Sequence, residues 1–444
     1  MSRSRACVPF LVMVLSAVGQ TSWQLVTTGQ LGCLNHAYDS GSDLVVALHG
    51  PTTMLFDGRT WSAISGITPG GGPLAYDRGR RKVVCYEDTH ALTWEWDGSV
   101  WQVVALVGPL AWAAGTTWSA SRQRVMLFGG ALYSGQSTPQ GMNELWEWDG
   151  TAWSLVPANN PPPTTSIIQN GTLNTAVYNT LVYDARRDRL VVSGRMLYPR
   201  RATIPVFGPG TWEWSASTGW QEVLTSSFEA YNLVYDERRA RCVAVGPWGA
   251  GARAYEWDGT GAWTIGAATP FNTGCLILAY DSRRGRTLFA RPNGEYWAYG
   301  PTNPATVDLH RPGCTAGGAV PTLTPSEPWT RPWLGGTYVI DVAPLPANLA
   351  LLIAGFGDQQ HGTIRLPLDL TPLGMPGCQL HITPETTVLL AGANGRATAS
   401  LQVPNTASLL GQHLFQQAIV LAPAANAAGL VVSDSVRAVV GRLN

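Results

Sequence analysis

The chain has 444 residues, of which 45% are hydrophobic and 13% charged, so it carries enough apolar material for folded domains and is neither disordered nor fibrous. Its 29 basic and 29 acidic residues give a formal net charge of zero at pH 7. A balanced charge lacks the positive field that nucleic acid or an anionic membrane surface requires, so neither partner is expected.

Residues 1–19 have the composition of an export signal. Arg3 and Arg5 precede an apolar stretch from Ala6 to Val18, and small residues at its end suit cleavage. The stretch is shorter than the roughly 20 residues of a membrane-spanning helix. We therefore expect an exported monomer without a membrane span, either secreted or located in the periplasm or on the cell surface.

Two short phrases alternate between residues 20 and 303. The first is an aromatic-Asp-Gly turn followed closely by tryptophan, as in Trp96-Asp97-Gly98 before Trp101. The second consists of Tyr-Asp, an Arg-rich turn and an apolar run. It begins at Tyr38, Tyr76, Tyr183, Tyr235 and Tyr280, and Trp118-Ser119 takes the place of Tyr-Asp once. Repetition at this spacing is typical of a repeat architecture, and the six starts indicate six units.

Each unit is predicted to be a four-stranded antiparallel meander, from its alternating apolar runs and turn residues. Asp-Gly between two runs favours a hairpin, because both central residues of a two-residue hairpin turn favour positive φ. The sixth unit lacks its last Trp-bearing strand, and a spare copy of that strand surrounds Trp23. We therefore predict an all-β fold with a six-bladed β-propeller over residues 20–303, closed by the N-terminal strand.

The third unit resembles the kelch repeat, the propeller family that includes the galactose oxidase scaffold. Its run from Met126 to Gly130 is similar to the family's apolar stretch with a double glycine, and the run from Asn143 to Asp149 with Trp153 resembles the downstream aromatic pair. The other units lack the double glycine. The resemblance implies the fold and a binding platform, while the copper site of galactose oxidase has no recognisable counterpart; no cofactor is expected.

A second, β-sandwich-like domain is expected over residues 307–444. Both phrases vanish there, and short apolar runs are separated by Gly, Pro and Asn. The region resembles a C-terminal β-module of secreted bacterial proteins. Cys314 and Cys378 are its only cysteines, and a bridge between them would contribute roughly 4 kcal/mol by closing a long loop. Cys33 and Cys275 are a second candidate pair, or buried thiols.

Residues that recur at one register in most units are expected to serve the scaffold. Glutamates recur between two aromatic residues, and arginine clusters recur after each Tyr-Asp. Local ion pairs are the simpler interpretation of these clusters. An anion-binding ring is the alternative.

Three long insertions, 131–142, 157–178 and 195–210, interrupt the repeat. Loop topology puts all three on the face opposite the tight turns, beside one mouth of the central channel. Their aromatic, amide and guanidinium groups suit carbohydrate or peptide recognition. The ligand-binding candidates are Tyr133, Asn143, Asn160, Gln169, Asn174, Tyr198, Arg200, Arg201 and Phe207. The alternative is that surface loops merely tolerate insertion.

Catalysis has less support in the sequence. His49, Glu87, Asp88 and His90 lie at similar strand ends in adjacent units, which would allow a small metal site, although no known ligand spacing supports it. Phosphate loops, nucleophile elbows and zinc-protease motifs are absent. We predict no catalytic residues and a secreted binding protein with an extracellular carbohydrate or protein ligand. The alternative is a secreted hydrolase, lyase or oxidase, metal-dependent or not, acting at the channel mouth.

Overall fold

The computed structural model describes residues 21–28, 35–112, 114–132, 140–163, 167–169, 172–174, 181–198, 206–224, 231–246, 252–270, 277–291, 293–314 and 318–443. The regular structure in these ranges is β-strand apart from two short 3-10 helices, η1 (Thr371–Leu373) and η2 (Ala407–Leu409). No helix in them is long and apolar enough to span a membrane. The predicted export signal, Cys33 and Cys275 lie outside the described residues.

Six four-stranded antiparallel sheets, here called blades, are described before residue 303. Blade 1 contains β2 (His36–Asp39), β3 (Leu44–His49), β4 (Thr52–Phe56) and β5 (Trp61–Ile64), and blade 2 contains β6 (Leu74–Asp77), β7 (Lys82–Glu87), β8 (Leu92–Trp96) and β9 (Trp101–Ala105). Blade 3 contains β10 (Gly115–Ser119), β11 (Arg124–Phe128), β14 (Leu145–Trp148) and β15 (Trp153–Val156), and blade 4 contains β18 (Leu181–Asp184), β19 (Arg189–Tyr198), β20 (Val206–Ser215) and β21 (Gly219–Leu224). Blade 5 contains β22 (Tyr231–Asp236), β23 (Arg241–Gly246), β24 (Arg253–Trp257) and β25 (Thr264–Ala268). Blade 6 contains β26 (Ile277–Asp281), β27 (Arg286–Ala290), β28 (Tyr296–Pro301) and the N-terminal strand β1 (Thr21–Thr27).

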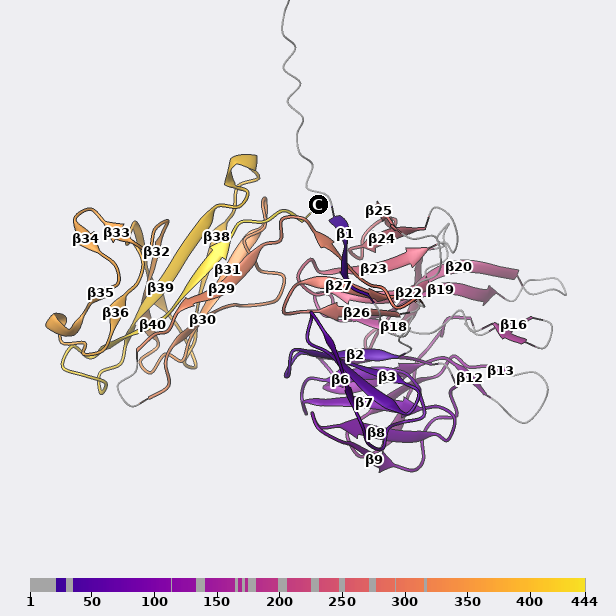
Figure 1. Ribbon diagram of the computed structural model, residues 1–444. Helices are drawn as coiled ribbons and strands as arrows, with labels where there is room; N and C mark the ends of the chain where they lie inside the picture. Colours follow the sequence, from indigo (N-terminus) through magenta and orange to yellow (C-terminus); the bar gives the residue numbers. More distant parts are fainter. Residues whose placement is uncertain are drawn as a thin grey trace, which may run out of the picture.

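The first strands of the blades lie next to one another in the cyclic order β2, β6, β10, β18, β22, β26 and back to β2, as expected for a propeller. Figure 1 shows the blades gathered in one body beside the C-terminal strands. Strand β1 pairs with β28, and Leu25 lies opposite Trp297. The Trp23 ring packs against Phe289 and Tyr299 of the same sheet. The predicted all-β, propeller-type fold is confirmed.

The repeated tryptophans explain how one blade adheres to the next. Trp101 in β9 donates its indole N–H to Thr53 Oγ1 of the preceding blade at 2.8 Å, and Trp153 in β15 does the same to Thr93. Each indole also contributes apolar area between two sheets, where aromatic side chains bury the most surface. Recurrence of tryptophan therefore marks the scaffold rather than a ligand site.

The Asp-Gly turns differ from the two-residue hairpin turn that their sequence suggested. Strands β8 and β9 pair Trp96 with Trp101, so four residues make the connection. Gly98 has φ of 103°, whereas Asp97 acts through its carboxylate, which accepts the backbone N–H groups of Ser99 and Val100, both at 2.9 Å. These bonds lower the pKa of Asp97 to about 2. The hairpins are present as predicted, but a side-chain carboxylate caps the turn.

The recurring charged residues form ion pairs within their blades, as predicted. In blade 5, buried Arg239 binds Asp236 and Glu256, both at 2.6 Å. The same pattern recurs in blade 2 around Arg80 and in blade 4 around Arg187. Each cluster fixes a tight turn to the third strand of its own blade.

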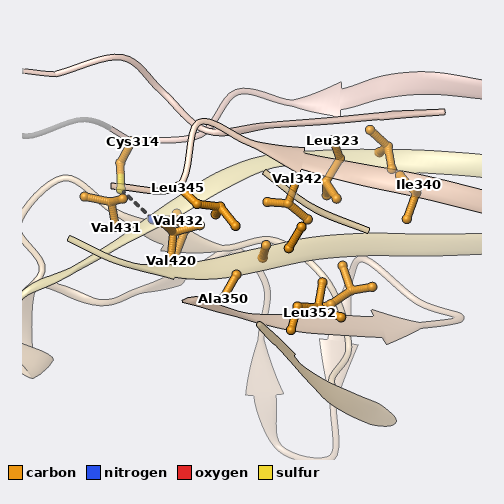
Figure 2. Packing of buried hydrophobic residues seen from close by; sticks show 14 of the residues in the cluster. Cys314, Leu323, Ile340, Val342, Leu345, Ala350, Leu352, Val420, Val431 and Val432 are labelled. Atoms are coloured by element: carbon orange, nitrogen blue, oxygen red, sulfur yellow. Dashed lines mark hydrogen bonds between the residues drawn. The ribbon is translucent and has the colours of Figure 1, made fainter. Parts of the chain in front are cut away.

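The C-terminal part, here called the module, is a β-sandwich-like pair of sheets. One sheet has the order β29 (Thr306–Arg311), β40 (Leu430–Val439), β39 (His413–Leu421), β32 (Leu349–Gly355) and β37 (Thr386–Ala391). The other has the order β30 (Thr322–Pro325), β31 (Thr337–Ala343) and β38 (Ala397–Gln402). The remaining short strands pair as ribbons: β33 (Gln360–His361) with β34 (Ile364–Arg365), and β35 (Leu368–Asp369) with β36 (Gln379–Leu380). Residues of both sheets share one apolar core (Figure 2).

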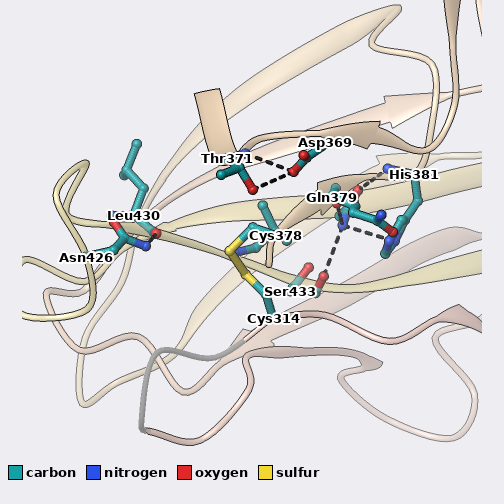
Figure 3. Close-up of a disulfide and its surroundings, with 11 residues drawn as sticks. Cys314, Asp369, Thr371, Cys378, Gln379, His381, Asn426, Leu430 and Ser433 are labelled. Atoms are coloured by element: carbon teal, nitrogen blue, oxygen red, sulfur yellow. Dashed lines mark hydrogen bonds between the residues drawn. A yellow bond between two sulfur atoms is a disulfide. The ribbon is translucent and has the colours of Figure 1, made fainter. Parts of the chain in front are cut away.

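The predicted bridge between Cys314 and Cys378 is present, with an S–S distance of 2.03 Å and a sequence separation of 64 residues (Figure 3). The sulfur of Cys314 also accepts the backbone N–H of Val432 in the core, as the dashed line in Figure 2 shows. Cys85 and Cys242 are buried free thiols in separate blades. The bridge therefore ties the start of the module to the segment before β36.

Candidate functional site

A channel with a cavity of about 180 Å³ runs between the first strands of the six blades. It is lined by residues of β2, β6, β10, β18, β22 and β26 and of the turns that follow them. The turns after these strands, together with the Asp-Gly turns, lie on one face of the propeller, here called the turn face. The opposite face, which carries the insertions, is called the insertion face.

The repeated tyrosines of the channel are engaged between blades. Tyr280 accepts the backbone N–H of Arg238 in the preceding blade at 3.0 Å, and Tyr235 accepts that of Arg186 at 3.3 Å. Burial raises the pKa of Tyr76 to about 12, with its partner Asp39 adding to the shift. These hydroxyls hold the turns of adjacent blades together and are therefore poor candidates for ligand binding.

Two other polar residues of the channel lining lack hydrogen-bond partners. The ring nitrogens of His36 and the hydroxyl of Thr116 are buried and make no hydrogen bond in the part of the chain that the structure describes. Burial lowers the pKa of His36 to about 3, so the imidazole is neutral at pH 7. Both residues lie at the beginning of their strands, at the end away from the turn face. These unpartnered polar atoms are thus nearer the insertion face.

The channel is obstructed at the turn face. Arg78, after β6, forms an ion pair with Glu237, after β22, and these strands lie on opposite sides of the ring. Segment 325–331 of the module lines a second cavity with turn-face residues, and Trp329 packs against an apolar cluster of blades 4 and 5. Entry to the channel is therefore easier from the insertion face.

The three insertions form hairpins on the insertion face. The first contains β12 (Ala131–Leu132) and β13 (Gln140–Gly141), and the second contains β16 (Ile167–Gln169) and β17 (Thr172–Asn174). The third is an extension of β19 and β20, in which pairing continues to Tyr198 and Val206. All three project away from the module in Figure 1. Their shared direction agrees with the loop topology that placed them together.

Few of the predicted ligand-binding side chains are described. Asn143, directly after the first insertion, is half-buried and donates from Nδ2 to the carbonyl of Pro162 in the second insertion at 3.4 Å. Asn160 is exposed, with φ of 51°. The structure gives only strand positions for Gln169, Asn174, Tyr198 and Phe207, while Tyr133, Arg200 and Arg201 lie outside the described residues. Their role in binding stays a prediction.

The weak metal candidates are partly engaged with one another. Glu87 is buried, and its two oxygens bind His90 Nδ1 and the indole N–H of Trp94, both at 2.7 Å. Within the described ranges, His, Cys, Asp and Glu side chains form no group of three or more that could hold a metal ion. Glu87 thus has a local structural role in its hairpin.

Sequence reasoning missed His36, Thr116, Arg78 and Glu237. The first two lie in short strands whose pattern is that of the repeat, and only the closed arrangement of blades shows that they line the channel. A usable signal for Thr116 was that it precedes Trp118, the one substitute for the repeated tyrosine. The Arg78–Glu237 pair joins residues 159 apart in sequence, so no local pattern could reveal it.

No family model matches the sequence. No curated protein matches it either. Among solved structures, the gluconolactonase XC5397 from Xanthomonas campestris aligns at 13% identity with a TM-score of 0.42, covering 63% of this chain and 90% of that one. A structural-genomics target provisionally assigned as a gluconolactonase aligns at 12% identity with a TM-score of 0.43, covering 64% of this chain and 92% of that one. The C-terminal WD40 domain of Sif2 aligns at 7% identity with a TM-score of 0.35, covering 63% of this chain and 98% of that one.

Proposed function

We propose that this chain is a secreted kelch-type propeller that binds a carbohydrate or peptide ligand at the insertion-bearing mouth of its channel. The observation that carries the proposal is the coincidence of two features at that mouth. The three inserted hairpins lie on that face, and the channel lining nearest to it includes His36 and Thr116, whose buried polar atoms have no hydrogen-bond partner.

The chemistry of the channel favours a neutral, hydroxyl-bearing group. A neutral imidazole offers one donor and one acceptor, and the threonine hydroxyl offers both, which matches the needs of a sugar hydroxyl. The cavity of about 180 Å³ is small for a ligand pocket. We therefore expect one sugar ring or one side chain to enter the channel, while the rest of the ligand contacts the hairpins.

Shortening the third hairpin tests this proposal. Residues 196–208 are replaced by Asn-Gly, which closes the hairpin at the Arg195–Pro209 pair. Binding in a glycan and peptide array screen should identify the ligand for the unaltered protein, and the affinity of the shortened variant, measured by calorimetry, should fall about tenfold or more. An unchanged affinity in a variant with a normal melting temperature would contradict the proposal.

A second variant examines the channel itself. His36→Phe combined with Thr116→Val removes the polar atoms while keeping the side chains large enough to fill their space. Carbohydrate affinity should drop because the buried hydroxyl of the ligand loses its partners. The matched control is Arg59→Ala, an exposed substitution on the turn face, which should leave affinity unaltered.

A further inference from the structure

A second cavity, of about 310 Å³, lies where the module meets the turn face of the propeller. The propeller contributes Ser40, Arg78, Glu237, Arg238 and Ser282, which come from turns of blades 1, 2, 5 and 6, and the module contributes Pro325, Ser326, Glu327, Pro328 and Arg331. The cavity therefore requires both parts of the chain. Its location separates it from the insertion-bearing mouth.

Two of the guanidinium groups that line this cavity form no ion pair in the described residues. Arg331 makes no ion pair in the described residues, and its buried Nε and Nη1 have no hydrogen-bond partner. Arg238 is 8% exposed, its Nε is unpartnered, and its Nη2 donates only to the backbone carbonyl of Arg283. Burial and the neighbouring charge of Arg238 lower the pKa of Arg331 to about 10.

Other arginines of the turn face are paired with carboxylates, although Arg80, Arg187 and Arg239 each keep one buried Nη2 without a hydrogen-bond partner. Arg80, Arg187 and Arg239 each bind a carboxylate in their own turn and a second one on the third strand. Arg238 and Arg331 depart from this pattern. Buried charges without partners are costly, so a site that keeps two of them side by side favours a ligand of opposite charge.

The carboxylates of the cavity do not fill this need. Glu237 pairs with Arg78 across the channel. Glu327 is exposed and forms no ion pair within the described residues. With these charges counted, the lining keeps an excess of positive charge beside Ser40 and Ser282, whose hydroxyls are able to donate, whereas the hydroxyl of Ser326 donates to Asp341.

We propose that this cavity binds a small oxyanion, such as phosphate, sulfate or a carboxylate group, between the guanidinium groups of Arg238 and Arg331. Planar guanidinium forks match the geometry of such anions and give charge-assisted hydrogen bonds. Serine hydroxyls complete the donor set. Because the two arginines come from the propeller and the module, the bound anion strengthens the docking of one part on the other.

Thermal unfolding of the full chain tests the proposal. Sodium phosphate, sulfate and acetate are titrated separately at constant ionic strength against chloride, and isothermal calorimetry measures affinity for each. We expect saturable binding of at least one oxyanion with a rise in melting temperature. Comparison of the three titrations distinguishes a phosphate or sulfate site from a carboxylate site. Absence of saturable binding in all three would overturn the proposal.

Arg331→Met is the decisive variant because its two effects have opposite signs. Without oxyanion it should unfold at the same temperature as the unaltered protein or higher, since a buried unpaired charge is removed. With oxyanion it should show at least tenfold weaker binding and lose the thermal stabilisation. Arg238→Met is a second variant that should weaken binding similarly, and the exposed Arg59→Met is the control that should bind normally. Equal affinity in Arg331→Met and the control would refute the site.

Discussion

Two buried histidines are expected to set the acid limit of stability. Burial lowers the pKa of His36 to about 3 and that of His381 to about 4, from the ordinary value of 6.5. Both are therefore neutral in the folded state at pH values where the unfolded chain binds a proton. Stability is complete above pH 6.5 and is lost as pH falls from there toward 4, by no more than about 1.4 kcal/mol per pH unit for each histidine.

Urea unfolding of the full chain at pH 7, 6, 5 and 4.5 checks this prediction. The carboxylates of the Asp-Gly turns, such as Asp97 with a pKa of about 2, lose their contribution only below about pH 4, so they do not confuse the window. His36→Gln should reduce the pH dependence of the propeller transition and leave that of the module unchanged. A free energy of unfolding that stays flat between pH 7 and 4.5 would be inconsistent with the two assignments.

At the scale of elements, the buried ion cluster of blade 5 offers a sharp comparison. The side chain of Arg239 is 0% exposed and binds two carboxylates, whereas the equivalent Arg80 in blade 2 is 31% exposed. Arg239→Met should destabilise the propeller by about 3–5 kcal/mol, because Asp236 loses its partner in a buried site. Arg80→Met should cost clearly less, since water reaches its carboxylate partners more easily.

Parallel denaturant titrations of the two variants measure this difference. Asp236→Asn combined with Arg239→Met is the control, because the double change removes both charges and should recover part of the lost stability. Equal free energies of unfolding in the two single variants would contradict the prediction that burial makes the blade 5 cluster contribute more than the blade 2 cluster.

Much of the secondary structure could be predicted because the same pattern of strands and turns occurs six times in the sequence. Strand alternation, the local Arg-Asp pairs and the spare strand around Trp23 were all legible in short stretches of sequence. The turn chemistry at Asp97 was predicted wrongly, because Asp-Gly favours a hairpin without revealing whether the carboxylate or the backbone of Asp makes the turn. The cavity between the propeller and the module could not be predicted, for a different reason. Arg238 and Arg331 come together through tertiary packing, and no local pattern connects residues from a blade and from the module.

At the scale of the whole molecule, the disulfide stabilises one part of the chain. The bridge closes a loop of 64 residues within the module, so Cys314→Ala with Cys378→Ala should lower the module's free energy of unfolding by roughly 4 kcal/mol. The propeller has its own clusters of buried residues and should keep its stability in the same variant. Two resolved transitions in calorimetry, of which only one moves, would bear this out, while a common shift would show that the two parts unfold as one unit.

The N-terminal strand imposes an order on biosynthesis. Thr21 is synthesised before all the other strands of the propeller, yet its hydroxyl bonds Tyr299, a partner 278 positions later. Strand β1 must wait unpaired until the last blade has emerged, and only then can that sheet be completed. During this interval its edge is open to unwanted pairing, so any delay in translation before residue 301 should favour aggregation over the native ring.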